Sequence, residues 1–244
     1  MTATLVSIPS SPWSIRAKLA LDVMGIELSV VTYVPTLSTP WLRWKLRRPV
    51  GPLTLPVLLW DGPPLTDSMD IVRWGCERSE CPLIEPDTLG AVTHWAAVAE
   101  RLLAAGRIRT THRVLGDPQA LGESLPPAVR QLGVLGLAAG RREAKRLLRK
   151  YGDGSGAAAQ AARMRAELRV ITEALGGRGT MLEEFSYADI VLATALSFVK
   201  PHSSHPLGPA ARVCWSADEL AEEFVELVAW RDQVYAEVER RRWR

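Results

Sequence analysis

At 244 residues, the chain is long enough to bury a sizeable core in one or two domains. Its 47% apolar and 23% charged residues are typical of soluble proteins, and no run approaches the roughly 20 apolar residues that a membrane span requires. The net charge of +3 is too small to indicate a nucleic-acid partner, so we interpret the basic runs at 141–150 and 240–244 as solvated helix faces.

The cysteines and the start of the chain predict a compartment. The three cysteines have neither a metal-ligand spacing nor an even number for disulfides. The first residues lack the charged and apolar regions of a signal peptide. We therefore expect a cytoplasmic protein that binds no metal and no membrane.

The first eighty residues alternate strand and helix signals. Residues 4–8 predict a buried strand, residues 12–24 a helix ended by Gly25, and residues 28–32 a second strand. An irregular segment then leads to a third strand at 56–60, a turn at Asp61-Gly62 and a short fourth strand around 64–66. A helix at 68–77 completes this part. The order is βαβ followed by ββα.

Beyond the prolines of residues 82–86 the apolar spacing becomes helical, over 88–109, 127–151, 156–175, 186–199 and 217–241. Ser186 and Asp189 have the spacing of a capping box, and the run from 190 to 196 has almost no polar face. The helix that starts at Ser186 is therefore expected to be buried. We predict an α/β domain at 1–80 and an all-helical domain at 87–244.

The turn between the first strand and the first helix is the best candidate for a site. Ser11, Pro12 and Arg16 place a hydroxyl and a cation at the start of a helix, where backbone N–H groups are unpaired and the helix dipole is positive. An anion such as a thiolate is favoured there. The alternative interpretation is structural: Ser11 and Pro12 would serve only as an ordinary N-cap and first helical residue.

Five segments in order, 11–21, 55–58, 65–71, 186–189 and 230–235, resemble the cytosolic glutathione transferases, and the first is closest to their serine-type tau and zeta forms. The resemblance implies a thioredoxin-like N-terminal domain followed by a helical domain, and a homodimer. It also implies a detoxifying enzyme that conjugates glutathione, as co-substrate, to a hydrophobic electrophile, or uses it for peroxide reduction or isomerisation.

The resemblance implies catalytic roles at the first helix. Ser11 would donate a hydrogen bond to the glutathione sulfur, supported by Arg16 and the helix dipole, because the thiolate is the reactive form. Ser14 and Ser10 are competing candidates for the same role.

The glutathione-binding residues are implied in the same way. Thr54, Leu55 and Pro56 would form a cis-proline segment whose backbone pairs with the ligand, with a plain trans proline as the alternative. Asp67 and Ser68 would hold the γ-glutamyl group, although both also suit a helix cap.

The sequence departs from the family before the cis-proline. Residues 49–54 lack the usual cation for the glycine carboxylate of glutathione, and Arg47 is the best-aligned replacement. This departure supports a second hypothesis, a non-catalytic module that binds ligands or partners. A glutaredoxin-like activity is a distant third, since position 11 is serine. Trp95, Arg101 and Arg109 are weak candidates to line the electrophile site.

Overall fold

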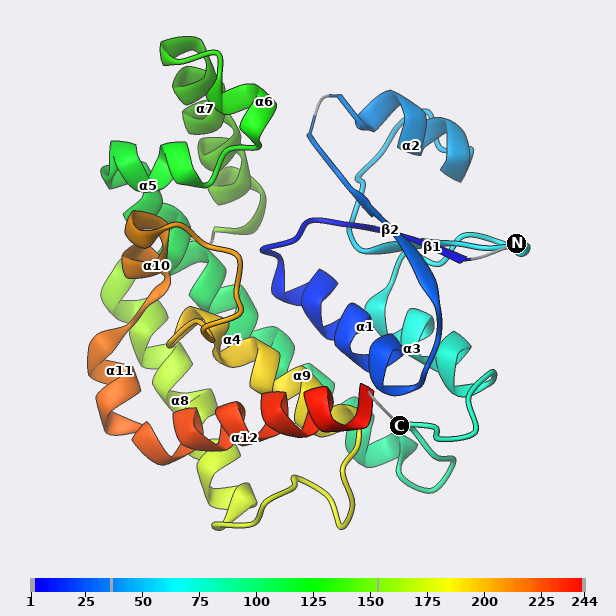
Figure 1. Cartoon of the computed structure of the whole chain (residues 1–244). Helices are drawn as coiled ribbons and strands as arrows, with labels where there is room; N and C mark the ends of the chain where they lie inside the picture. Colours follow the sequence, from blue (N-terminus) through cyan, green and yellow to red (C-terminus); the bar gives the residue numbers. More distant parts are fainter. Residues whose placement is uncertain (1–2, 36, 153, 243–244) are drawn as a thin grey trace.

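The computed structural model describes residues 3–35, 37–152 and 154–242, so Trp243 and Arg244 of the last basic run lie outside the described residues. Figure 1 shows an α/β part beside a larger helical part. The α/β part contains β1 (Ala3–Ser7), α1 (Pro12–Val23), β2 (Leu28–Thr32), α2 (Thr39–Leu46), β3 (Val57–Leu59) and α3 (Ser68–Cys76). The sheet order is β2-β1-β3, with β1 parallel to β2 and antiparallel to β3. The predicted βαβ unit and third strand are thus confirmed.

Two predictions for the α/β part were wrong. The fourth strand is only an isolated bridge between Leu58 and Leu65, because Pro63 and Pro64 just before it have no N–H to donate to a sheet. The segment between β2 and β3 is not irregular throughout, since it contains α2. That helix buries only Leu42, so its apolar repeat is too short to be recognised as helical.

The helical part consists of α4 (Leu89–Gly116), α5 (Pro118–Glu123), α6 (Pro127–Arg130), α7 (Val134–Tyr151), α8 (Ala157–Leu175), α9 (Tyr187–Ala195), the 3₁₀ turn η1 (Leu196–Phe198), α10 (Pro209–Trp215), α11 (Asp218–Glu223) and α12 (Val225–Arg242). The long helix α4 packs along α8 and α9. In Figure 1, α5, α6 and α7 lie together near the end of α4, and α5 also packs against α10. The all-helical prediction for this part of the chain is confirmed.

Several helix boundaries differ from the prediction. The helix expected at 127–151 is broken at Gly133, whose φ of 55° only glycine adopts without cost. The helix expected at 217–241 is interrupted at Phe224, and α4 extends to Gly116 rather than 109. The short helices α5 and α10 were not predicted.

The buried helix α9 holds the two parts together. All nine of its residues are buried, and the capping box of Ser186 and Asp189 is present as predicted. The helix α1 packs against α3 on one side and against α9 and α12 on the other. The helix α1 is therefore covered on two sides, and its start lies where the two parts meet (Figure 1).

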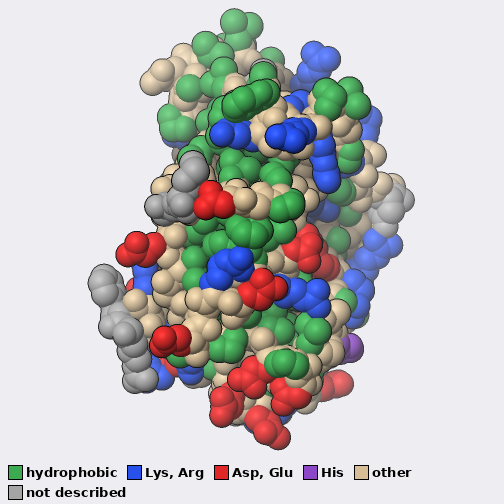
Figure 2. All heavy atoms as spheres, turned by 90° about the vertical axis from the view of Figure 1, so that its right-hand side faces the viewer, with side chains coloured by type: hydrophobic (Ala, Val, Ile, Leu, Met, Phe, Trp, Pro, Cys, Tyr) green, Lys and Arg blue, Asp and Glu red, His purple; other side chains and the backbone are tan. Residues whose placement is uncertain are grey.

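Charge is unevenly distributed over the surface. On the face drawn in Figure 2, basic and hydrophobic side chains gather toward the top, and most acidic side chains lie lower down. Within the described ranges, no helix is long and apolar enough to cross a membrane.

Candidate functional site

The start of α1 presents an unused hydroxyl. Ser11 is the N-cap residue in extended conformation, with Pro12 as the first helical residue. Its side chain does not cap the helix, and none of the described residues forms a hydrogen bond with it. A half-buried hydroxyl at the positive end of a helix can donate to an anion.

The other two serines of this turn differ from Ser11. Ser14 is buried, and its Oγ accepts a hydrogen bond from the Ile8 N–H at 3.2 Å, so it fastens the loop after β1. This geometry argues against Ser14 as the group that activates a thiol. Ser10 is half-buried, and its backbone carbonyl is bound by a distant histidine, described below.

A buried network joins α1 to α3 and α4. The Arg16 guanidinium donates to Ser68 Oγ at 2.6 and 3.0 Å and to Glu100 Oε1 at 2.5 Å. Glu100 also accepts from the indole N–H of Trp13 at 3.0 and 3.1 Å. Arg16 thus positions Ser68 at the start of α3. Glu100 completes this network from α4, and no motif in the sequence indicates it.

The start of α3 is capped by Asp67. Its Oδ1 accepts from the backbone N–H of Met69 at 2.8 Å and of Asp70 at 3.4 Å, while the residue is exposed. Ser68 beside it is buried. The hydroxyl of Tyr187, from α9, is close enough to interact electrostatically with Arg16, and burial raises the pKa of Tyr187.

The segment before β3 lies at the same edge of the sheet as the start of α1. Val6 pairs with Val57, so β3 begins where β1 ends. The Leu55-Pro56 peptide is cis, as predicted. Thr54 Oγ1 donates to the Thr66 carbonyl at 3.3 Å, which holds this segment near α3. The backbone N–H and carbonyl of Leu55 have no hydrogen-bond partner among the described residues, so they are open to an extended ligand.

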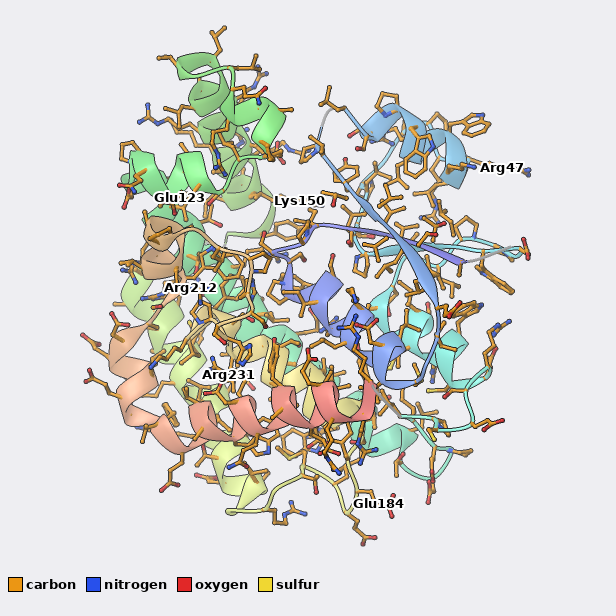
Figure 3. The ribbon with its side chains drawn as sticks, in the orientation of Figure 1. Arg47, Glu123, Lys150, Glu184, Arg212 and Arg231 are labelled. Atoms are coloured by element: carbon orange, nitrogen blue, oxygen red, sulfur yellow. The ribbon has the colours of Figure 1, made fainter. Side chains whose placement is uncertain are left out.

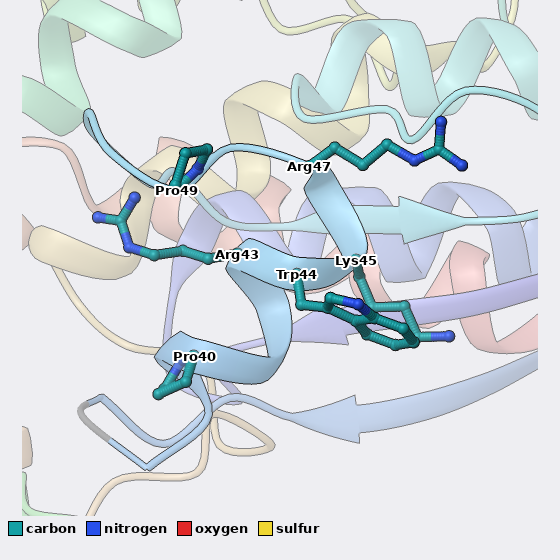
Figure 4. A pocket seen from close by; sticks show the side chains of 6 residues that line it. All are labelled: Pro40, Arg43, Trp44, Lys45, Arg47 and Pro49. Atoms are coloured by element: carbon teal, nitrogen blue, oxygen red, sulfur yellow. The ribbon is translucent and has the colours of Figure 1, made fainter.

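Arg47 is not brought to this edge. It is the exposed left-handed residue that ends α2, and Figure 3 shows its side chain projecting outward at the end of α2 far from the start of α1. Figure 4 shows Arg43 and Arg47 pointing in opposite directions from α2. Arg43 donates to the backbone carbonyls of Arg48 and Gly51 at 3.2 and 2.9 Å. The shallow recess drawn there therefore contains no predicted catalytic residue.

On the helical side, a cation faces Trp13. The Arg107 guanidinium carbon, from α4, lies 5.0 Å from the Trp13 ring centre and 3.7 Å from that of Tyr151. No carboxylate pairs with Arg107 in the described part of the chain, and burial lowers its pKa. This cation between two aromatic rings was not predicted. Of the proposed lining residues, Arg101 pairs instead with Glu167 at 2.7 Å and Arg109 binds the Ser216 carbonyl at 2.9 Å.

His205, from the helical part, holds the turn that contains Ser10 and Ser11. Its Nε2 donates to the Ser10 carbonyl at 2.9 Å, because a carbonyl can only accept. The ring is buried, and its centre is 5.0 Å from that of Trp215. Burial lowers the pKa of His205 to about 4, so the ring is neutral at physiological pH.

None of the described residues form a cluster of three or more His, Cys, Asp or Glu that could hold a metal ion. The site consists of a helix start, an open strand edge and an arginine-serine-glutamate network. It belongs to an α/β part with a thioredoxin-like arrangement, which the helical part of the same chain completes.

Comparison with known proteins shows what this fold resembles. Residues 10–78 match the family model of the glutathione S-transferase N-terminal domain. No curated protein matches the sequence. The fold is similar to a glutathione S-transferase of Methylobacterium radiotolerans solved with glutathione sulfonate, at 20% identity and a TM-score of 0.59 over 96% of this chain and 90% of the other.

Two further structures agree with this result. A glutathione S-transferase of Methylobacillus flagellatus with bound glutathione has 19% identity and a TM-score of 0.59, over 96% of this chain and 93% of the other. One of Ceriporiopsis subvermispora in complex with glutathione has the same identity and score, over 99% and 98%. Residues 10–78 thus match the glutathione S-transferase N-terminal domain, and the whole chain has a fold similar to that of these solved structures.

Proposed function

We propose that this protein is a glutathione transferase that activates the glutathione thiol with Ser11 and conjugates it to a hydrophobic electrophile. The observation that carries the proposal is the unpartnered Ser11 hydroxyl at the positive end of α1, on the same sheet edge as the open backbone of Leu55. The glutathione or glutathione analogues in the similar structures support glutathione as the ligand.

Each part of glutathione has a matching group at this edge. The backbone of Leu55 would pair with the cysteinyl peptide of the ligand as an added strand, beside Thr54 and Pro56. Ser68 and the start of α3 would take the γ-glutamyl carboxylate, and Asp67 its ammonium group. Arg16 would act indirectly, by holding Ser68 in place through the 2.6 Å hydrogen bond. The thiol then faces Ser11.

The chemistry follows from this placement. A hydrogen bond from Ser11 and the α1 dipole both favour the thiolate over the thiol, and the proton leaves to solvent. The thiolate sulfur attacks an electrophilic carbon, a C–S bond forms, and the leaving group departs with its electron pair. The electrophile would lie on the helical side, near Trp13, Arg107 and Tyr151. The same thiolate could serve peroxide reduction or isomerisation.

The remaining expectations belong to the same proposal. Residues 1–80 would form the glutathione-binding domain and residues 87–244 the domain that contributes the electrophile site. The protein would act in the cytoplasm as a homodimer with a detoxifying role.

One observation favours the second hypothesis, a non-catalytic binding protein. Arg47 points away from the start of α1, and residues 49–54 contain no cation. The glycine carboxylate of glutathione therefore lacks an evident partner within this segment, which weakens glutathione binding in particular.

The first prediction concerns the thiol of bound glutathione. We expect its pKa to lie about two units below that of free glutathione, a difference of about 2.7 kcal/mol, and to rise most of the way toward the free value in Ser11→Ala, where only the α1 dipole remains. The thiolate absorbance of the complex, recorded across pH, measures both values. Ser10→Ala is the matched control, because alanine keeps the backbone carbonyl that His205 binds. Glutathione bound to this variant should retain the lowered thiol pKa.

Three outcomes oppose the proposal in different ways. A lowered thiol pKa that is lost in Ser10→Ala but not in Ser11→Ala would move the role to Ser10. Bound glutathione with an ordinary thiol pKa would contradict thiol activation. A folded protein that binds no glutathione would support the non-catalytic hypothesis.

A further inference from the structure

Two segments of the chain concentrate its positive charge. Residues 28–60 and 124–152 together contain eleven Lys and Arg but only one acidic residue, Glu143, whereas the whole chain has a net charge of +3. The rest of the chain is therefore net acidic. The cations are Arg43, Lys45, Arg47, Arg48, Arg130, Arg141, Arg142, Lys145, Arg146, Arg149 and Lys150.

The same two segments hold most of the large apolar side chains that are exposed to solvent. Nine of the twelve such side chains among the described residues belong to them: Val30, Val31, Leu37, Trp41, Trp44, Val50, Leu132, Val134 and Leu135. Val134 is 81% exposed and Leu135 75%, at the start of α7, and Val50 is 81% exposed after α2. Exposed aliphatic residues clustered in this way mark an interaction surface.

The helices of both segments lie at one end of the molecule. In Figure 1, α2 and the α6–α7 cluster occupy the top of the view, and Figure 2 shows basic and hydrophobic side chains at that end after a quarter turn. Arg146 of α7 is near enough to Tyr33, just after β2, to interact with it electrostatically. We call this surface, formed by the exposed residues of 28–60 and 124–152, the basic apolar face.

We infer that the basic apolar face docks on an anionic lipid bilayer. Its cations match the negative potential of anionic headgroups, and its exposed aliphatic tips can enter the boundary between headgroups and acyl chains. The helix α7 carries six cations along its length behind the apolar start, the pattern of a helix that lies in the membrane surface. Trp44, 71% exposed with Lys45 Nζ 5.1 Å from its ring centre, is an aromatic residue suited to the interface.

Other partners fit this face less well. A second copy of the same face would bring together two surfaces that each carry a large excess of positive charge. Nucleic acid would satisfy the cations but offers little apolar surface to the exposed side chains of Val134, Leu135 and Val50. The basic runs of α7, which the sequence predicts to be solvated helix faces, would therefore contact lipid headgroups. Such binding at the membrane surface needs no membrane-spanning helix.

Co-sedimentation of the full chain with vesicles tests this inference. We expect the protein to bind vesicles of phosphatidylcholine mixed with phosphatidylglycerol much better than pure phosphatidylcholine, and to be released by salt. Arg141→Gln with Arg142→Gln, both exposed, should weaken binding roughly 25-fold, since each cation contributes about 1 kcal/mol near an anionic surface. Val134→Ser with Leu135→Ser should weaken it about tenfold.

The control replaces exposed aliphatic residues elsewhere. Val213→Ser with Val225→Ser removes two comparably exposed side chains outside the face and should leave binding unchanged. Equal binding to both kinds of vesicle, or equal losses in the control and the Val134/Leu135 variant, would overturn the inference. So would tight binding to a DNA or RNA oligonucleotide combined with no binding to anionic vesicles, which would assign the face to nucleic acid.

Discussion

Replacing Asp189 by alanine is expected to lower the free energy of unfolding by about 4 kcal/mol. The carboxylate is buried and accepts the backbone N–H of Met181 at 2.7 Å and of Ser186 at 2.8 Å, together with the Ser186 hydroxyl at 3.3 Å. Alanine would leave two buried backbone donors without partners, and each costs roughly 1–3 kcal/mol. The capping box of α9 would also be lost.

Denaturant unfolding monitored by circular dichroism measures this loss. Asp189→Asn keeps one carbonyl acceptor and should fall between the wild type and the alanine variant. Glu184→Ala provides the control, since Glu184 is an exposed acid in the loop before α9 and should change stability by less than about 0.5 kcal/mol. A loss below about 1 kcal/mol in Asp189→Ala would show that α9 does not depend on its cap.

The Asp189 cap illustrates what the sequence can predict. Its signal is local: a capping box lies within four residues and is followed by an uninterrupted apolar run. The same holds for β1 and α1, whose ends differ from the predicted ones by no more than one residue, and for β2, whose bounds agree with the prediction. Short-range spacing determines these elements, so one sequence is enough to find them.

The missed elements have weak local signals. The helices α2, α5 and α10 are each eight residues or shorter, so an apolar repeat has little more than two turns in which to develop. The breaks at Gly133 and Phe224 interrupt patterns that otherwise continue on both sides. A fourth strand would need partners on β3 beyond the single pair that Leu65 makes.

The site divides in the same way. Ser11, Leu55, Pro56, Asp67 and Ser68 lie in short motifs and meet at one sheet edge. Glu100, Arg107 and His205 come from the helical part. Their partners Arg16, Trp13 and Ser10 lie 84, 94 (107 − 13) and 195 positions earlier in the chain. No spacing rule connects such residues. Arg47 was predicted from its position in the sequence but points away from the site, because a position in the sequence does not give the direction of a side chain.

Acid is expected to destabilise the protein through His205. Its pKa is about 4 in the folded protein and 6.5 when unperturbed, and burial is the main cause, with Arg212, His202 and Arg231 acting in the same direction. Since the unfolded chain binds the proton more tightly, the contribution of His205 to stability is complete above about pH 6.5. It is lost as pH falls toward about 4, and a difference of this size corresponds to about 3 kcal/mol.

Unfolding by urea between neutral pH and about pH 4 should reveal this loss, and His205→Gln should show a pH dependence flatter by about 3 kcal/mol. Glutamine can still donate to the Ser10 carbonyl but does not titrate. His112→Gln, at an exposed position on α4, is the control and should retain the wild-type slope. Identical slopes in wild type and His205→Gln would contradict a buried neutral ring.

The expected pH dependence also reaches the candidate site. Protonation would place a second N–H on Nδ1 of His205, which is buried and has no partner in the described part of the chain. The favoured response is for the ring to leave its position, which releases the Ser10 carbonyl and with it the turn that presents Ser11. Glutathione binding should therefore weaken in acid before the protein unfolds. In His205→Gln it should persist to lower pH, which isothermal titration calorimetry can measure on both proteins.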